Sequence, residues 1–177
     1  GVTFKEGGTN FTNSLLVGTD TTGTLSSADG NTGVGTGVLA ALTTGDDNAA
    51  VGLCALNANT TGACNTAIGV GALIANTTAA ENTAVGSASM LGNITGALNV
   101  AVGRCSLRCN TTADDNTAVG HASLFANTTG AENTAVGYKA LDANTTGSNN
   151  TAVGTNALGA NTTASNNTAV GYLSLAA

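Results

Sequence analysis

The sequence predicts an all-β protein, a parallel β-solenoid (β-roll) of about ten coils with 17 residues in each. First, the phrase Asn-Thr-Ala-Val-Gly and its variants recur every 17 residues with no insertion or deletion, which is the signature of a repeat architecture. Second, the units are rich in Val and Thr, which favour strands. Third, the unit is too short for helix-pair repeats of roughly 33 to 47 residues, and its Gly would break a helix.

The repeat keeps one phase through almost the whole chain. We number each unit from its opening Asn and call the residues that share one position a rank. Rank 1 is Asn31, Asn48, Asn65, Asn82, Asn99, Asn116, Asn133, Asn150 and Asn167. Rank 5 is Gly18, Gly35, Gly52, Gly69, Gly86, Gly103, Gly120, Gly137, Gly154 and Gly171. At about 3.3 Å per residue, one unit supplies two short strands with two turns, or one coil of a narrow solenoid.

The two ends of the chain differ from each other. Residues 1–13 do not keep the ranks and are predicted to form an N-terminal cap or docking segment, whereas residues 14–177 form the β-solenoid repeat domain. The last unit stops at Ala177, eleven residues into its coil. An unpaired strand edge invites another chain to pair. Three outcomes are therefore open: the rod continues in a further domain, a partner caps it, or the first segment of a neighbouring copy completes this coil and produces a head-to-tail filament.

Five ranks are predicted to form continuous stacks along the rod. Val at rank 4 and Leu at rank 9 are expected in the interior. Asn at rank 1, and again at rank 12, is expected to form ladders of side-chain amides at turns. Gly at rank 5 is expected to supply a positive φ or a close backbone approach at a corner. The residues that represent these stacks are Asn65, Asn82, Asn116, Asn133, Val85, Val119, Val136, Leu73, Leu124, Leu141, Gly86, Gly120 and Gly137.

Ranks 3 and 4 are both apolar, Ala followed by Val, although neighbouring residues of a strand face opposite ways. One rank must therefore point into the coil, and the other must form a flat apolar stripe along the outside. Because a long exposed apolar patch usually marks an interface, we expect identical chains to pack along this stripe as a homotrimer. A single rod with an unusually apolar face is the alternative.

The phrase NTAVGYKALDANTTG resembles the repeats of phage and cyanophage tail fibres, and NTAVG is more distantly similar to the NSVAIG phrase of YadA-like trimeric autotransporter adhesin heads. Those heads are left-handed parallel β-rolls that assemble as trimers and have a shorter repeat. The resemblance covers roughly residues 14–177. It implies a stiff spacer and attachment rod, a fibre on a virion or an extracellular surface, whose partner would be a cell-surface receptor or a glycan.

The side chains offer little chemistry. His121 is the only His and stands at the variable rank 6, whereas a catalytic triad or a zinc site needs more than one such residue. The Gly-rich phrase at residues 33–37 belongs to the repeat, and no helix pattern follows it, so it is not a phosphate loop. We predict a non-enzymatic protein with no catalytic, cofactor-binding or metal-binding residues.

Charged residues make up only 8% of the chain. Acids gather in the last turn of the coil, at Asp46, Asp47, Glu81, Asp114, Asp115 and Glu132. A solvated turn explains this cluster, and a Ca²⁺ site is the alternative. The four cations, Lys5, Arg104, Arg108 and Lys139, form no phosphate-binding stripe, so no nucleic-acid partner is expected. No stretch has the ~18 consecutive apolar residues of a membrane helix, so no membrane insertion is expected either.

The cysteines do not suggest an obvious pairing within the chain. Cys54 and Cys105 share rank 7 but lie three coils apart, about 14 Å by the coil spacing, which is beyond disulfide reach. Cys105 and Cys109 are too far apart in an extended segment, and Cys54 could reach Cys64 only across the coil. All four are candidates for disulfides between neighbouring chains, or for free thiols.

An ice-binding β-solenoid is a further alternative, because the chain is rich in Thr. An ice-binding face needs two outward Thr ranks that are two residues apart on a flat strand. The Thr pairs of ranks 13 and 14, such as Thr60 and Thr61 or Thr145 and Thr146, are adjacent and should therefore face opposite ways. This pattern does not favour ice binding at that pair.

Overall fold

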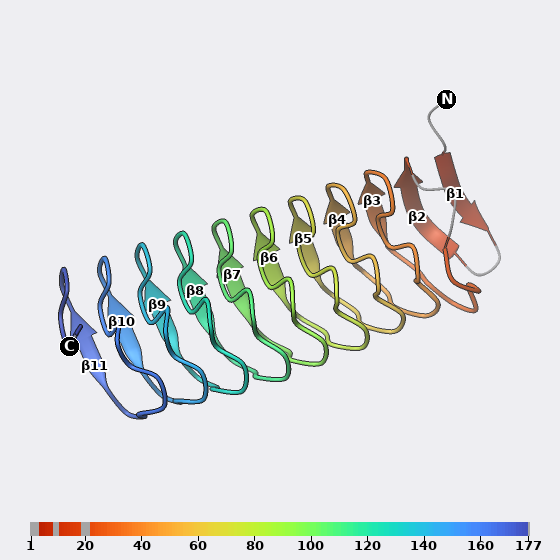
Figure 1. The fold of residues 1–177 in the computed structure, drawn as a ribbon. Coiled ribbons are helices and arrows are strands. Elements are labelled where there is room, and N and C mark those ends of the chain that lie inside the picture. The colour runs from red at the N-terminus through yellow and green to blue at the C-terminus, as the bar shows by residue number, and fades with distance from the viewer. Residues whose placement is uncertain (1–3, 9–10, 19–21, 177) are drawn as a thin grey trace.

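The computed structural model describes residues 4–8, 11–18 and 22–176, and it is a β-solenoid with one coil every 17 residues (Figure 1). Eleven strands form one sheet in chain order. The bounds of the strands are β1 Phe4–Gly8, β2 Phe11–Val17, β3 Thr32–Val34, β4 Ala49–Val51, β5 Thr66–Ile68, β6 Thr83–Val85, β7 Val100–Val102, β8 Thr117–Val119, β9 Thr134–Val136, β10 Thr151–Val153 and β11 Thr168–Val170. The predicted fold class, an all-β parallel solenoid, is confirmed.

From β3 to β11, each coil contains a single three-residue strand at ranks 2–4, and the remaining residues form turns. The strands pair parallel with equivalent residues opposite each other, as in Thr134 beside Thr151. Backbone hydrogen bonds continue this ladder beyond the strand on both sides. The N–H of Gly137 donates to Val119 O at 2.8 Å, and the N–H of Glu132 donates to Asp114 O at 3.2 Å. The coil is thus one strand with turns, rather than two strands.

The N-terminal end of the sheet is closed by the chain itself. β1 pairs antiparallel with β2, so that Lys5 lies opposite Leu16. On its other side, β2 pairs parallel with β3 through Leu15, Leu16 and Val17. Residues 4–8, which belong to the predicted cap or docking segment, therefore occupy the free edge of the first coil.

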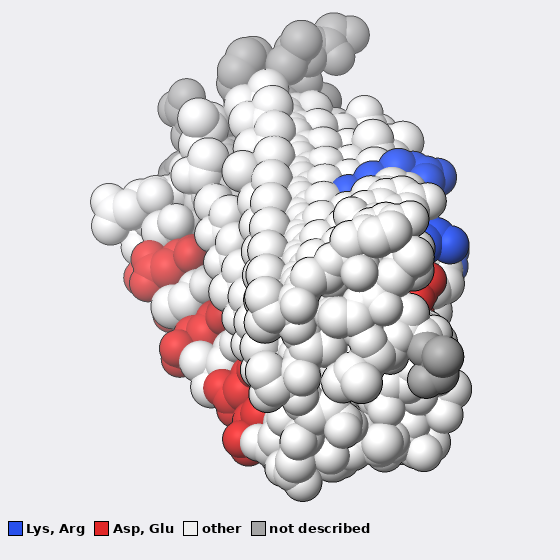
Figure 2. All heavy atoms as spheres, turned by 90° about the vertical axis from the view of Figure 1, so that its left-hand side faces the viewer, with Lys and Arg blue, Asp and Glu red and all other residues white. Residues whose placement is uncertain are grey.

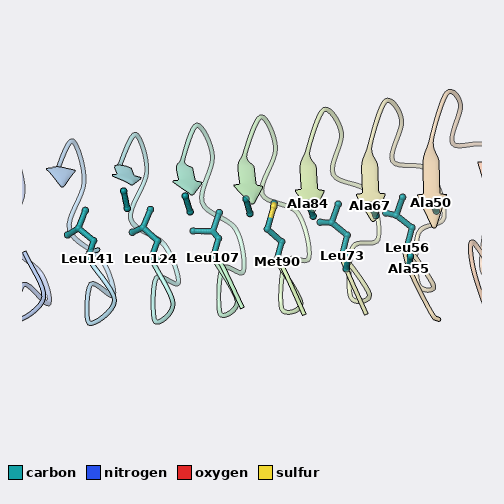
Figure 3. Close-up of a cluster of buried hydrophobic side chains, with 14 of the residues drawn as sticks. Ala50, Ala55, Leu56, Ala67, Leu73, Ala84, Met90, Leu107, Leu124 and Leu141 are labelled. Carbon is teal, nitrogen blue, oxygen red and sulfur yellow. The ribbon is translucent and has the colours of Figure 1, made fainter. Parts of the chain in front are cut away.

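The interior contains Ala at rank 3 and Leu or Met at rank 9, stacked from coil to coil (Figure 3). Leu73, Leu124 and Leu141 are fully buried, as expected. The prediction that the Val side chains of rank 4 point into the interior was wrong. Val85 and Val119 are only partly buried and Val136 is 37% exposed, whereas the neighbouring Ala84, Ala118 and Ala135 are 0% exposed. The Val rank stacks on the outside of the coil.

The width of the coil explains why Ala points inward. At β3 the inward residue is Gly33, and a Cβ placed on it would come within 2.5 Å of Leu16 Cδ2 and 3.1 Å of Val38 Cγ1. In the next coil the corresponding pair is Ala50 with Ala55. A smaller residue at rank 3 thus accompanies a larger one at rank 8. Because protein interiors are close-packed, a row of Val at rank 3 would not fit.

Left-handed backbone conformations form the corners of every coil. Twenty-five of the described residues other than Gly have positive φ, and they belong to ranks 7, 9 and 17. Leu124 at rank 9 has φ 49°, and Lys139 at rank 7 has φ 53°. Because such a φ costs roughly 1–2 kcal/mol per residue and β-branched residues tolerate it worst, the absence of Val, Ile and Thr from these described corner positions has a steric cause.

The Gly of rank 5 meets both conditions that were expected of it. Gly137 has φ 140°, and a Cβ added to it would lie 2.5 Å from the carbonyl oxygen of Gly154 in the next coil. Equivalent contacts recur at Gly86 and Gly120. The backbones of neighbouring coils touch at this corner, so that only Gly fits.

Two ladders of Asn side chains run through the coils. At rank 1, the Nδ2 group of Asn133 donates to Asn116 Oδ1 at 3.1 Å, and the backbone N–H of Asn133 donates to the same oxygen at 3.0 Å. At rank 12, the Nδ2 group of Asn144 donates to Asn127 Oδ1 at 2.9 Å. Asn65, Asn82, Asn116 and Asn133 are all 0% exposed. The interior is therefore partly polar, and in the described part of the chain every buried side-chain nitrogen or oxygen has a partner.

Candidate functional site: the outer face of the sheet

The outer face of the parallel sheet is a regular surface that runs along the rod. Its side chains come from ranks 2 and 4, because ranks 1 and 3 point inward. Val51, Ile68 and Val136 are 41%, 44% and 37% exposed. Thr occupies rank 2 at Thr32, Thr66, Thr83, Thr117, Thr134, Thr151 and Thr168. We call these two outward ranks the sheet face. The predicted apolar stripe therefore exists, but it consists of Val and Ile beside Thr instead of Ala.

The Thr hydroxyls differ in what they bind. At rank 13 they donate to a backbone carbonyl of the next coil, as Thr128 Oγ1 does to Thr145 O at 3.0 Å. Rank 14, with Thr129 and Thr146, is exposed. These two ranks do not form one flat double row, in line with the sequence pattern. The sheet face does carry two outward ranks two residues apart, one of Thr and one of Val, and the sequence analysis missed it by assigning Val to the interior.

The two borders of the sheet face carry opposite charges. Rank 17 lies just before the strand and contains Asp47, Glu81, Asp115 and Glu132; we call it the acidic border. Ranks 6 and 7 follow the strand and are mostly uncharged, but in the coils of β7, β8 and β9 they contain Arg104, His121, Tyr138 and Lys139; we call these four residues the basic border. Seen along the rod, most acids lie on one side and Lys and Arg on the other, where a single acidic patch lies beside them (Figure 2). The sheet face thus has acidic residues along one border and basic residues along the other.

The basic border is held together by contacts between neighbouring coils. The rings of His121 and Tyr138 are stacked, with centroids 5.4 Å apart and planes 12° apart. An Arg104 guanidinium nitrogen lies 3.3 Å from His121 Nε2. Lys139 Nζ lies 6.0 Å from the Tyr138 ring centroid and 3.7 Å from Asp142 Oδ2. His121 is exposed at rank 6, as expected, and has neighbours in register.

Several acids of the last turn act as acceptors for the backbone. Asp114 Oδ1 accepts a hydrogen bond from the N–H of Ala97 at 2.7 Å, and Asp46 Oδ1 accepts one from the N–H of Asp29 at 2.8 Å. Ser148 Oγ does the same for Ala131 at 3.0 Å. Each bond joins one coil to the next at rank 16. The described residues contain no group of three or more acids, His or Cys that could hold a metal ion.

The four cysteines are unpaired within the chain. Cys105 is buried, Cys54 and Cys109 are partly buried, and Cys64 is exposed. Cys54 belongs to rank 7 and Cys64 to rank 17, so they lie on opposite borders of the sheet face. The disulfides predicted between chains remain a prediction.

Comparison of the chain with protein-family models, with curated proteins and with solved structures found no match. None of the described residues form a helix with the length and hydrophobicity needed to cross a bilayer. Functional inference therefore rests on the regular outer face, its charged borders and the ladders beneath it.

Proposed function

We propose that the protein is a non-enzymatic structural fibre, a stiff rod whose identical copies associate through the sheet face. The observation that carries the proposal is the row of half-exposed Val and Ile that runs from coil to coil along one flat side. Val34, Ile68 and Val153 are 43%, 44% and 36% exposed at widely separated coils. Monomeric soluble proteins rarely expose contiguous apolar patches of more than a few hundred Å². A second copy would cover this row.

The interior supports a mechanical role. Backbone hydrogen bonds, two Asn ladders and the Leu stack all run along the rod axis, so each coil is fixed to its neighbours. Such a rod is stiff without the large apolar core of a globular domain. A homotrimer on a virion or an extracellular surface, acting as a spacer that presents variable ranks to a receptor or glycan, is the form of this function that the tail-fibre resemblance implies.

The head-to-tail filament is less well supported than lateral association. That filament uses the N-terminal segment of one copy to complete the last coil of another. In the structure, β1 already pairs with β2 of its own chain. We therefore place the association at the sheet face.

The test is the mass in solution, measured by multi-angle light scattering, combined with two matched variants. Val102→Lys with Val136→Lys puts two cations on the sheet face and should convert the assembly to a monomer. Thr112→Lys with Thr146→Lys puts the same charges on the exposed rank 14 of the same two coils and should leave the mass unchanged. A monomeric unmodified protein, or equal effects of the two variants, would overturn the proposal.

Ice binding is the second candidate, and the outward Thr rank favours it. Thr117 and Thr134 stand in register in β8 and β9, two residues from the Val rank, and successive coils repeat this pair at about 4.8 Å. If the sheet face binds ice, the unmodified protein shows thermal hysteresis and Thr117→Tyr with Thr134→Tyr abolishes it. Thr129→Tyr with Thr146→Tyr on rank 14 is the control. A solution without thermal hysteresis excludes this candidate.

A further inference from the structure

The charges at the two borders of the sheet face would favour one relative orientation of two associated copies. This step rests on the proposed association through the sheet face. The outward ranks alternate with inward ones in the order 17, 2, 4 and 6. Rank 17 carries four acids, ranks 2 and 4 are mostly Thr and Val, and rank 6 carries Arg104 and His121 among uncharged residues. Within one coil, Glu132 precedes β9, and Tyr138 and Lys139 follow it. In the preceding coil, Asp115 and His121 flank β8 in the same way.

Symmetry decides which borders meet. When two such faces pack with their rods parallel, an axis along the rods brings the acidic border of one copy against the basic border of the next. When the rods are antiparallel, a twofold axis across them brings acid against acid and cation against cation. We propose that a second copy of this chain docks on the sheet face with its rod parallel, so that Asp115 and Glu132 of one copy face the basic border of the other.

The ion pairs between the borders and the apolar contacts of the Val rank differ in strength and therefore in role. Exposed ion pairs stabilise a complex by only about 0–1 kcal/mol each, so the Val rank supplies most of the affinity. Charge complementarity mainly selects one orientation and disfavours the other, because like charges brought together are repulsive. In a closed parallel ring the copies stand at the same height, which places Glu132 beside Lys139 and Asp115 beside His121. Arg104 then lies one coil away, about 4.8 Å along the rod.

The residues needed for this pairing are available. Asp115 and Glu132 are exposed, and their side chains take part in no hydrogen bond or ion pair among the described residues. Arg104 is exposed and contacts only His121 among the described side chains. Lys139 has one partner, Asp142, at 3.7 Å, and its side chain remains 43% exposed. A Lys fits the turn at rank 17, since Lys139 itself has a positive φ.

Charge reversal tests the proposal. Asp115→Lys with Glu132→Lys makes both borders basic, and Arg104→Glu with Lys139→Glu makes both acidic. Each double variant should raise the dissociation constant about tenfold or more, and the quadruple variant should restore association. In an antiparallel assembly, by contrast, like charges would still face each other in the quadruple variant. Weaker association of the double variants, followed by recovery in the quadruple variant, would then not be observed. Failure of the quadruple variant to recover overturns the proposal.

A second measurement reads the orientation directly and does not depend on surface charge. In a variant with all four Cys replaced by Ala, a spin label is attached at Thr44→Cys or, separately, at Thr163→Cys, two exposed rank 14 positions seven coils apart. Parallel rods give short distances between copies for both labels, and antiparallel rods give long distances for both. Long distances between the labels in a stable oligomer would reject the parallel orientation but not the proposed fibre function. A monomer rejects the fibre itself.

Discussion

At the scale of single residues, backbone conformation explains the composition of the corners better than polarity does. From the coil of β3 onward, rank 9 is Leu except at Met90, although Ile and Val are equally apolar. Leu107 and Leu124 both have φ 49°, and Met90 has φ 48°. A γ-branched or unbranched side chain tolerates this left-handed φ, while two heavy atoms on Cβ crowd the adjacent backbone. Shape at Cβ is therefore the constraint.

Leu124→Ile should therefore be much more damaging than its volume suggests. A volume-conserving apolar swap usually costs less than about 1.5 kcal/mol, and the second heavy atom on the Cβ of Ile adds strain at the left-handed φ that Leu avoids. Leu124→Met is the matched control, because Met90 occupies the same rank. Urea unfolding should place the Ile variant at a clearly lower midpoint than the Met variant. Equal midpoints would show that the positive φ does not select the residue.

At the scale of the coil, the stabilising element is a ladder, in which each member serves both neighbours. Asn116 Oδ1 accepts the backbone N–H and the side-chain Nδ2 of Asn133. Its own Nδ2 donates to Asn99 Oδ1 at 3.2 Å and to Asp114 O at 3.1 Å. Removing the Asn116 amide thus leaves the buried backbone N–H of Asn133 without its acceptor. Asn99 Oδ1 keeps the backbone N–H of residue 116, and Asn133 Nδ2 keeps Gly147 O.

Asn116→Ala should destabilise the rod by about 3 kcal/mol, because a buried donor left unsatisfied costs about 1–3 kcal/mol and further bonds are lost. Hydrogen exchange should show the loss of protection first at the amide of Asn133. The control is Asn156→Ala at rank 7, where Ala88 and Ala122 already occur with the same positive φ. That variant should cost less than about 1 kcal/mol. If both variants behave alike, the rank 1 ladder is not a main source of stability.

At the scale of the whole molecule, the rod is a one-dimensional stack in which each coil contacts its neighbours alone. Strand pairing follows chain order from β1 to β11 without exception. In such solenoids, stability is approximately a sum of terms for coils and for the interfaces between them. The length of the rod can therefore change in whole coils, but not in fractions of one.

Deleting residues 66–82 removes one period and should leave a folded, shorter rod, in which Asn99 stacks directly on Asn65. Deleting residues 66–81 removes one residue fewer, so that every later rank is displaced relative to the coil below. The first variant should keep a cooperative thermal transition by circular dichroism with a moderately lower midpoint. The second should lose the transition or show it only for part of the chain. Similar behaviour of both would argue against strict register.

The period alone determined the architecture. A 17-residue repeat without insertions requires stacked coils, and the Asn, Gly and Leu ranks follow because identical side chains then lie above one another. The alternation of side chains along a strand predicts that Ala84 and Val85 face opposite ways, but it does not predict which of them faces inward. The closed coil decided this, because from β3 onward its interior is filled by Leu or Met at rank 9 and holds only Ala or Gly at rank 3. The same closure places Glu132 and Lys139 on opposite borders of one outer face. This placement depends on corners where the backbone has a positive φ. Apart from Gly, no residue type in the sequence predicts such a corner by itself.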